Sequence, residues 1–266
     1  MPFQRINGIQ IYYEDYGKGD PVLLIQGLGY PSGMWFLQIP DLSLHFRTIV
    51  FDNRGVGRSD KPDEEYSVAL MASDASELLR ALGIGKAHVV GISLGGYIAQ
   101  EMVLQQPDRV DRLVLLATTC GGPEYLELTK DLWSETAALR SLPADEMIRK
   151  GMALAASPGF VQRHPDLIER GVRVRLENLQ PLYAFSRQAA AAYLFNSKDR
   201  AHLIRCPTLI LAGAQDRVMP LQLTQLLAGI IPEARLKVYP DAGHLLFLEK
   251  AQEINQMIVE FLAEKK

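Results

Sequence analysis

The chain has 266 residues, of which 48% are hydrophobic and 22% charged, with 28 Lys plus Arg against 31 Asp plus Glu. These values are typical of a folded protein of one or two domains, and they exclude disordered and fibrous classes. The formal net charge is −3 and no basic block occurs, so nucleic acid is not an expected partner.

The cysteines and the N-terminus bear on the expected compartment. Cys120 and Cys206 cannot build a disulfide framework, and no histidine or second cysteine follows either at metal-ligand spacing. The first ten residues do not read as a signal peptide, and no apolar run approaches the roughly 18 residues that span a bilayer. We therefore predict a cytoplasmic protein without a membrane span; the sequence does not indicate its oligomeric state.

The chain is expected to open with an antiparallel hairpin. Apolar and polar residues alternate over residues 3–6 and 9–16, and the pair Asn7-Gly8 between them suits a two-residue turn. Short and almost wholly apolar runs follow, as expected of strands buried on both faces. These runs are residues 22–25, 48–51, 88–90, 113–117, 208–212 and, more weakly, 236–239.

Helical patterns alternate with these runs. Residues 67–82 and 95–106 carry apolar side chains at helical spacing, and Gly83 and Pro107 stop the two helices. Alternating strands and helices predict an α/β fold, a mostly parallel sheet with helices on both faces. Residues 121–200 contain only helical patterns, so we expect a core of residues 1–120 and 201–266 with a helical lid inserted between two strands.

The segment Gly91-Ile92-Ser93-Leu94-Gly95-Gly96 is the most informative motif. It follows one apolar run directly and opens a helix, and G-x-S-x-G in that setting is the nucleophile elbow. The small residues permit a tight turn that lifts the serine hydroxyl above the sheet, at a helix N-terminus that favours developing negative charge. Ser93 is therefore the predicted nucleophile; a glycine-rich turn with an incidental capping serine is the structural alternative.

A serine hydroxyl needs a base, which is most often a histidine oriented by a carboxylate. Among five histidines, His244 alone follows a predicted strand through a Pro/Gly turn into a final helix, so it is the predicted base. Asp216 lies in the turn after residues 208–212 and gives the chain order Ser93, Asp216, His244. Asp241 and Asp52 are rival carboxylates, and each is better explained as holding its own loop.

Acyl transfer also needs two N–H donors for the oxyanion. The residue after the nucleophile, Leu94, supplies one, and the turn after residues 22–25 should supply the other. Within that turn, Gln26-Gly27-Leu28-Gly29, we choose Leu28. No metal or cofactor is needed for this chemistry.

These motifs resemble the α/β-hydrolase fold family, in its single-lid branch of esterases, enol-lactone hydrolases, C–C bond hydrolases and cofactor-free haloperoxidases. The likeness covers nearly the whole chain and is carried by residues 26–29, 52–59, 91–96, 107–114, 213–220 and 242–244. It implies an eight-stranded, mostly parallel sheet with an inserted cap and a Ser-Asp-His triad. Ser93 stands where dehalogenases and epoxide hydrolases of the family carry aspartate, which implies an acyl-serine. Gln26 stands where many relatives carry histidine.

The substrate is less well defined by the sequence, because one scaffold carries many chemistries. Aromatic and aliphatic residues of the lid, such as Trp133 and Phe185, suit an apolar acyl group but equally suit packing. A carboxylesterase for short- to medium-chain esters is the first expectation, and a lactonase for acyl-homoserine lactones or enol-lactones is the second. A C–C bond hydrolase is the third expectation, because a substrate carboxylate could be bound by lid arginines, namely Arg149, Arg173, Arg175 and Arg187. A perhydrolase or haloperoxidase is the last.

Two other classes of protein share parts of this pattern. A dinucleotide-binding oxidoreductase could use Gly27 and Gly29, but the third glycine of its fingerprint is replaced by Ser32, after Pro31. A non-catalytic receptor could keep the fold, but it would not need all three triad residues and both oxyanion turns. We therefore expect an enzyme whose partner is a small ester or lactone.

Overall fold

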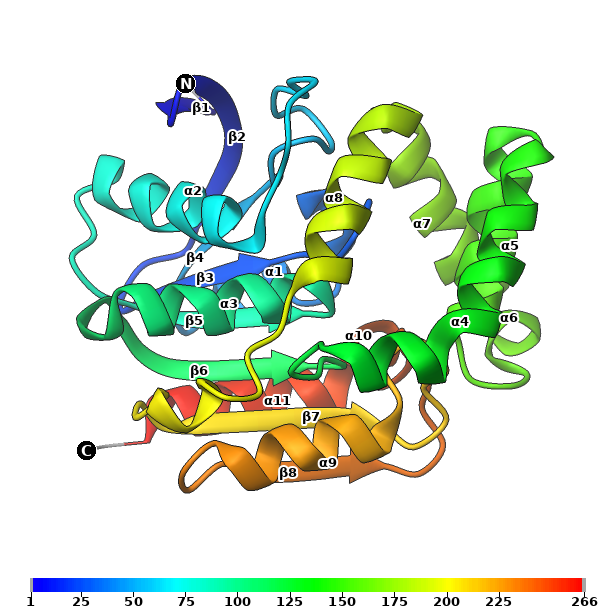
Figure 1. The fold of residues 1–266 in the computed structure, drawn as a ribbon. Helices are drawn as coiled ribbons and strands as arrows, with labels where there is room; N and C mark the ends of the chain where they lie inside the picture. The colour runs from blue at the N-terminus through cyan, green and yellow to red at the C-terminus, as the bar shows by residue number, and fades with distance from the viewer. Residues whose placement is uncertain (1, 265–266) are drawn as a thin grey trace.

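The computed structural model describes residues 2–264, which form an eight-stranded sheet with helices on both faces (Figure 1). The sheet order is β1-β2-β4-β3-β5-β6-β7-β8, with β1 and β2 antiparallel to their neighbours and the remaining pairs parallel. The strands are β1 (Phe3–Ile6), β2 (Ile9–Tyr16), β3 (Pro21–Ile25), β4 (Arg47–Phe51), β5 (Ala87–Ile92), β6 (Val110–Leu116), β7 (Thr208–Gly213) and β8 (Arg235–Tyr239). The predicted α/β class and mostly parallel sheet are confirmed.

The opening hairpin forms at the predicted pair. Asn7 and Gly8 both have positive φ, 47° and 85°, which matches the twist of two-residue hairpin turns. Ile6 then pairs with Ile9, and β2 continues beside β4.

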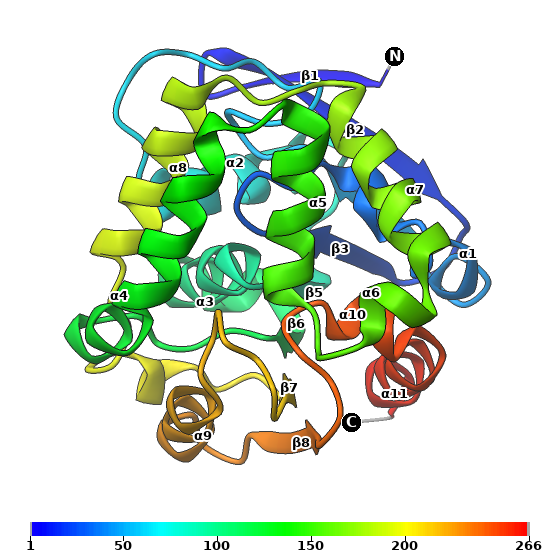
Figure 2. The same cartoon turned by 90° about the vertical axis from the view of Figure 1, so that its right-hand side faces the viewer.

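Helices cover the sheet on both sides. Figures 1 and 2 show α2 (Val68–Ala81), α3 (Leu94–Gln105) and α9 (Leu221–Ile230) on one face, with α1 (Ile39–Leu42), α10 (Leu246–Glu249) and α11 (Ala251–Ala263) on the other. Each face buries an apolar cluster, centred on Met71, Ile98 and Leu227 on the first and on Leu42, Ile254 and Ile258 on the second. The central strands are buried on both sides, as their uninterrupted apolar runs require. None of the described helices has the length and apolar character needed to cross a membrane.

Further helices lie between β6 and β7. They are α4 (Pro123–Ala138), α5 (Ala144–Ala155), α6 (Phe160–Arg163), α7 (Pro165–Leu176) and α8 (Leu182–Leu194). Short 3-10 helices occur elsewhere along the chain as well as here; they are η1 (Ser32–Trp35), η2 (Pro107–Arg109), η3 (Leu139–Ser141) and η4 (Ala201–Leu203). We call α4 to α8 the inserted helices. They stand beyond the carboxyl ends of the parallel strands in both ribbon views, over the edge where the loops of a parallel sheet converge.

Candidate active site

Ser93 occupies a sharp turn between β5 and α3. Its backbone has φ 56° and ψ −122°, a conformation that is strained for a residue with a Cβ and is typical of functional positions. The flanking glycines make the turn possible: a Cβ on Gly91 would lie 2.2 Å from the carbonyl oxygen of Gly95, and one on Gly95 would lie 2.1 Å from that of Ile25. Small residues are therefore obligatory on both sides of the serine.

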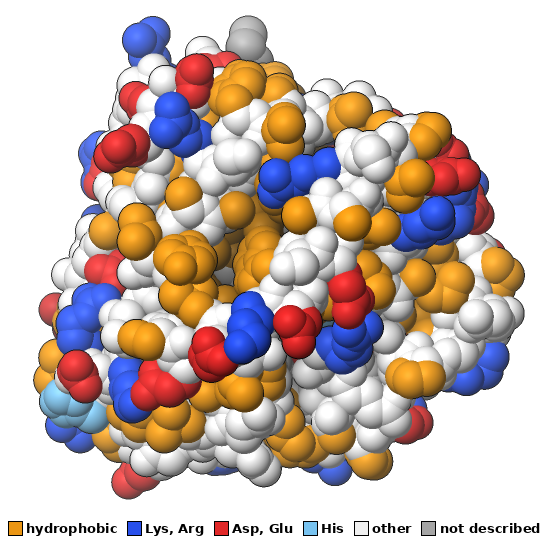
Figure 3. Space-filling view, turned by 45° about the vertical axis from the view of Figure 1, so that its right-hand side comes forward, with side chains coloured by type: hydrophobic (Ala, Val, Ile, Leu, Met, Phe, Trp, Pro, Cys, Tyr) orange, Lys and Arg blue, Asp and Glu red, His pale blue; other side chains and the backbone are white. Residues whose placement is uncertain are grey.

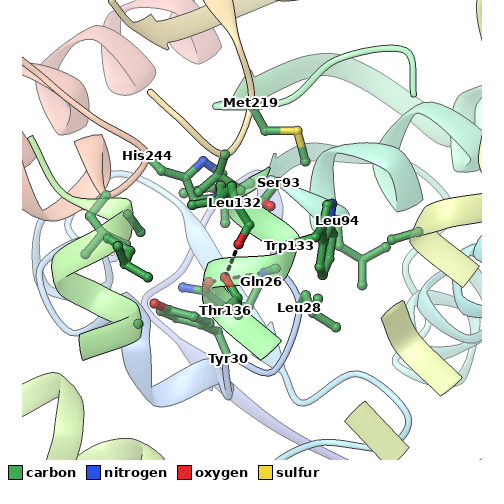
Figure 4. Close-up of a pocket in the computed structure, with 18 of the residues that line it drawn as sticks. Gln26, Leu28, Tyr30, Ser93, Leu94, Leu132, Trp133, Thr136, Met219 and His244 are labelled. Carbon is green, nitrogen blue, oxygen red and sulfur yellow. Dashed lines mark hydrogen bonds between the residues drawn. The ribbon is translucent and has the colours of Figure 1, made fainter. Parts of the chain in front are cut away.

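Hydrogen bonds to β6 and the segment after it hold the strained serine in place. The Ser93 N–H donates to the carbonyl of Leu116 over 3.0 Å, and the Thr118 hydroxyl donates to the Ser93 carbonyl over 2.9 Å. The side chain points into a pocket, where Figure 4 shows it near His244.

His244 and Asp216 form a buried hydrogen-bonded pair. The distance from His244 Nδ1 to Asp216 Oδ2 is 2.9 Å, and the aspartate side chain is 1% exposed. The other carboxylate oxygen of Asp216 accepts the backbone N–H groups of Val218 and Met219, both at 2.7 Å. These bonds fix the carboxylate, and a proton on Nδ1 leaves Nε2 of the imidazole as the free base.

The turn that carries His244 is fastened to the inserted helices. The His244 N–H donates to the carbonyl of Ala155 over 2.8 Å. The Glu249 carboxylate accepts the N–H groups of Gly243, at 3.1 Å, and Ser157, at 3.3 Å, while burial raises the pKa of Glu249 above its usual value. Glu249, the last residue of α10, could not be predicted from the sequence, because a glutamate at a helix end is ordinarily solvated.

The predicted oxyanion donors line the same pocket. Leu28 lies in the turn after β3 and Leu94 is the first residue of α3, and within residues 2–264 neither backbone N–H has an acceptor in the protein. Two amide-bearing side chains brace the Leu28 turn: Asn53 donates to the Gln26 carbonyl over 3.0 Å, and Gln188 of α8 accepts the Gly29 N–H over 3.1 Å. Gln188 was also missed, because a lone glutamine in a helix carries no sequence signal.

The pocket is small and mostly apolar. Its volume is about 170 Å³, and the space-filling view shows it as a hollow with hydrophobic side chains inside (Figure 3). The inserted helices supply much of its wall, and Figure 4 shows several of these side chains facing Ser93. The apolar wall includes Leu132, Trp133, Leu154, Phe185, Val218 and Met219.

The rival carboxylates have other partners. Asp241 is an exposed residue that pairs with Lys250 at 2.7 Å, and it makes no contact of that kind with His244. Asp52 accepts the backbone N–H groups of Ser32 and Arg58 at 2.6 and 2.7 Å, and burial raises its pKa. Both carboxylates hold loops, as expected. Within the described part of the chain, no group of three or more His, Cys, Asp or Glu side chains is placed to hold a metal ion.

Comparisons with known proteins agree with this architecture. Residues 20–251 match the family model described as the alpha/beta hydrolase fold. The chain is 29% identical to a putative carbamate hydrolase, RutD, of Azorhizobium caulinodans, over 99% of both chains. Among solved structures, it is similar to Est816, described as an N-acyl homoserine lactone degrading enzyme. The TM-score is 0.85 and the sequence identity 31%, over 98% of this chain and 100% of Est816.

A thermophilic esterase from Thermogutta terrifontis is a further similar structure, with a TM-score of 0.82 and 31% identity over 98% of this chain and 96% of that one. The family match spans most of the sequence. The chain therefore belongs to the alpha/beta hydrolase fold family, and it is a hydrolase.

Proposed function

We propose that this protein is a serine hydrolase that cleaves carboxylic esters through an acyl-serine intermediate. The observation that carries the proposal is the 2.9 Å bond between Asp216 and His244, because His244 lines the same pocket as Ser93 on its strained turn. Serine, carboxylate and histidine in this chain order form the catalytic set of serine hydrolases on this kind of scaffold.

The proposed reaction runs in two similar halves. His244 Nε2 takes the proton of the Ser93 hydroxyl as the oxygen attacks the ester carbonyl, and the N–H groups of Leu28 and Leu94 stabilise the oxyanion. The tetrahedral intermediate expels the alcohol, which receives the proton from His244. Water then attacks the acyl-serine with His244 again as base, and the carboxylic acid leaves while Ser93 regains its proton. Asp216 orients the imidazole and stabilises its positive charge throughout.

The size of the pocket supports small acyl groups. An apolar cavity of about 150 Å³ is known to hold benzene, so about 170 Å³ suits a short- to medium-chain acyl group. We propose that the inserted helices act as a lid that keeps this space apolar. A lactonase is the second candidate, favoured by the 31% identity to Est816; a lactone is an internal ester and can be opened by the same residues.

A panel of 4-nitrophenyl esters of graded acyl length, together with acyl-homoserine lactones, tests the proposal. Ser93→Ala is expected to lower kcat by about 10⁶, as in serine enzymes where one triad member is removed. A fluorophosphonate should add its mass at Ser93 in the wild type only. Full activity in Ser93→Ala, or labelling elsewhere, would contradict the proposed mechanism, and faster turnover of the lactones would favour the second candidate.

A further inference from the structure

Gln26 carries a buried hydrogen-bond donor that has no acceptor. The residue follows β3 directly and is 1% exposed. Its Oε1 accepts the N–H of Gly27 over 3.3 Å, which fixes the orientation of the side-chain amide. Its Nε2 is buried and has no hydrogen-bond partner among the described residues. An unpaired N–H in a protein interior is unfavourable, so this atom calls for an explanation.

The amide lies beside the reacting centre. Gln26 lines the pocket, and Figure 4 shows it on the same side as Tyr30 and Thr136. The next residue, Gly27, packs so closely on the nucleophile that a Cβ there would lie 3.0 Å from Ser93 Cβ. A substrate whose ester carbonyl is bound at Ser93 therefore lies next to the Gln26 segment.

Gln26 is not the only residue at the pocket with a buried donor that lacks a hydrogen-bond partner among the described residues. The Nε of Arg175 is buried and has no acceptor in the described part of the chain, and its guanidinium stands over the Tyr30 ring, 4.4 Å from the centroid. None of the buried side-chain oxygens that lack a partner within residues 2–264 lines this pocket. The protein thus offers unpaired donors there, and the complementary ligand is one that brings an acceptor.

We propose that Gln26 is a specificity-determining residue whose side-chain amide donates a hydrogen bond to a second oxygen of the substrate's acyl group. That oxygen is a keto or hydroxyl oxygen on the second or third carbon of the acyl chain. An uncharged oxygen matches the neutral amide of Gln26, whereas a carboxylate would be expected to pair with the Arg175 guanidinium at the same pocket. The inference rests on the proposed ester or lactone hydrolysis and narrows its substrate class.

Kinetics with matched esters test the proposal. The substrates are ethyl butanoate, ethyl 3-oxobutanoate, ethyl 3-hydroxybutanoate and, as the charged alternative, monoethyl succinate, followed by acid release in a pH-stat. Gln26→Glu keeps an acceptor for the Gly27 N–H but removes the donor, and Gln26→Met removes both. Gln256→Met, an exposed glutamine bonded to Glu260 on α11, is the control.

In both Gln26 variants, kcat/KM for ethyl 3-oxobutanoate and ethyl 3-hydroxybutanoate should fall about tenfold more than kcat/KM for ethyl butanoate, mainly through a rise in KM. The control variant, Gln256→Met, should leave the ratios of kcat/KM between the four esters at their wild-type values. An equal loss for all four substrates would show that Gln26 only shapes the turn and would overturn the proposal. A selective loss for monoethyl succinate alone would overturn it in favour of a carboxylate site.

A binding measurement separates this inference from the proposed function. In the Ser93→Ala background, NMR titration should give a Kd for ethyl 3-oxobutanoate about tenfold lower than that for ethyl butanoate, and Gln26→Met should remove the difference. If Ser93→Ala keeps its activity, the proposed mechanism fails while this titration still decides the role of Gln26. Equal Kd values for the two esters with Gln26 present would overturn the inference.

Discussion

The backbone N–H of His244 donates to the carbonyl of Ala155, the last residue of α5, over 2.8 Å. The histidine turn is thus held by the inserted helices as well as by the sheet. Gly243 sits at the point of closest approach, where a Cβ would lie 2.6 Å from the Ser157 nitrogen and 2.8 Å from the Ala155 oxygen. Any side chain there must push the two segments apart.

We therefore expect Gly243→Ala to lower kcat by about 10²-fold, because a shift of about 1 Å in a catalytic group costs that much. Steady-state kinetics with a 4-nitrophenyl ester measure the change. Gly229→Ala is the matched control, since a Cβ at that position in α9 meets nothing within 4 Å and alanine favours the helix. Similar activity in the two variants would show that the contact between α5 and the histidine turn is unimportant.

Asp216→Asn tests the orientation of the histidine. The asparagine can keep one acceptor oxygen for the Val218 and Met219 amides, so the fold should persist. The amide cannot hold His244 in the required tautomer, and kcat should fall by about 10⁴. The measurement is kcat beside a thermal melt, and an unchanged melt with nearly full activity would remove Asp216 from the mechanism.

Gln188→Leu tests the support of the oxyanion turn. Gln188 is fully buried; it accepts from the Gly29 N–H, and its amide donates to the Arg54 carbonyl over 2.8 Å. Leucine leaves the Gly29 N–H and the Arg54 carbonyl without this partner, so the oxyanion turn should shift. We expect kcat to drop by about 10²-fold with little change in KM. Stopped-flow acylation with a chromogenic ester would locate the defect, and a rise in KM alone would argue for a role in binding instead.

The buried ion pair below the site should dominate the stability of its loop. Arg54 is 1% exposed and binds Asp74 through two hydrogen bonds of 2.6 and 3.0 Å. Asp74→Ala leaves a buried guanidinium that is only partly compensated, and this should cost about 3–5 kcal/mol of unfolding free energy. Tm should fall by about 10 °C. Asp63→Ala, which removes an exposed pair with Arg187, should cost less than about 1 kcal/mol. Equal losses in urea melts would contradict this difference.

The thiol of Cys206 should react slowly at neutral pH. Burial raises its pKa to about 11, so the reactive thiolate is scarce below that value and increases as pH rises. Between pH 8 and pH 10, the rate of alkylation by iodoacetamide should increase about 100-fold. Peptide mass spectrometry follows the modification, and rapid alkylation at pH 8 would show that the thiol is more exposed than the structure indicates.

Much of the fold could be predicted because its signals are local. Unbroken apolar runs such as residues 208–212 belong to strands buried on both faces, and Asn7-Gly8 specifies its hairpin through positive φ. The elbow was equally visible, since Gly91 and Gly95 are fixed by close backbone approach on either side of Ser93. The structure places Ser93 and His244 in one pocket and bonds Asp216 to His244, and the catalytic roles of the three residues stay predictions until the variants are assayed.

The supports of the site could not be predicted. Glu249 and Gln188 are polar residues in helices, where a solvated position is the ordinary outcome, and their burial arises only when distant segments pack. The unpaired amide of Gln26 is likewise a property of three-dimensional packing. The direction of its donor depends on the bond from Gly27.

The bonds from the His244 N–H to Ala155 and from the Gly29 N–H to Gln188 limit how the inserted helices can be exchanged. A chimera that grafts this segment from another relative would need to supply an acceptor at each of these two points to keep the catalytic geometry. Cavity-lining side chains such as those of Leu132 and Leu154 form no such hydrogen bond. Substrate range should therefore be easier to evolve from the cavity-facing positions than by replacing the whole segment.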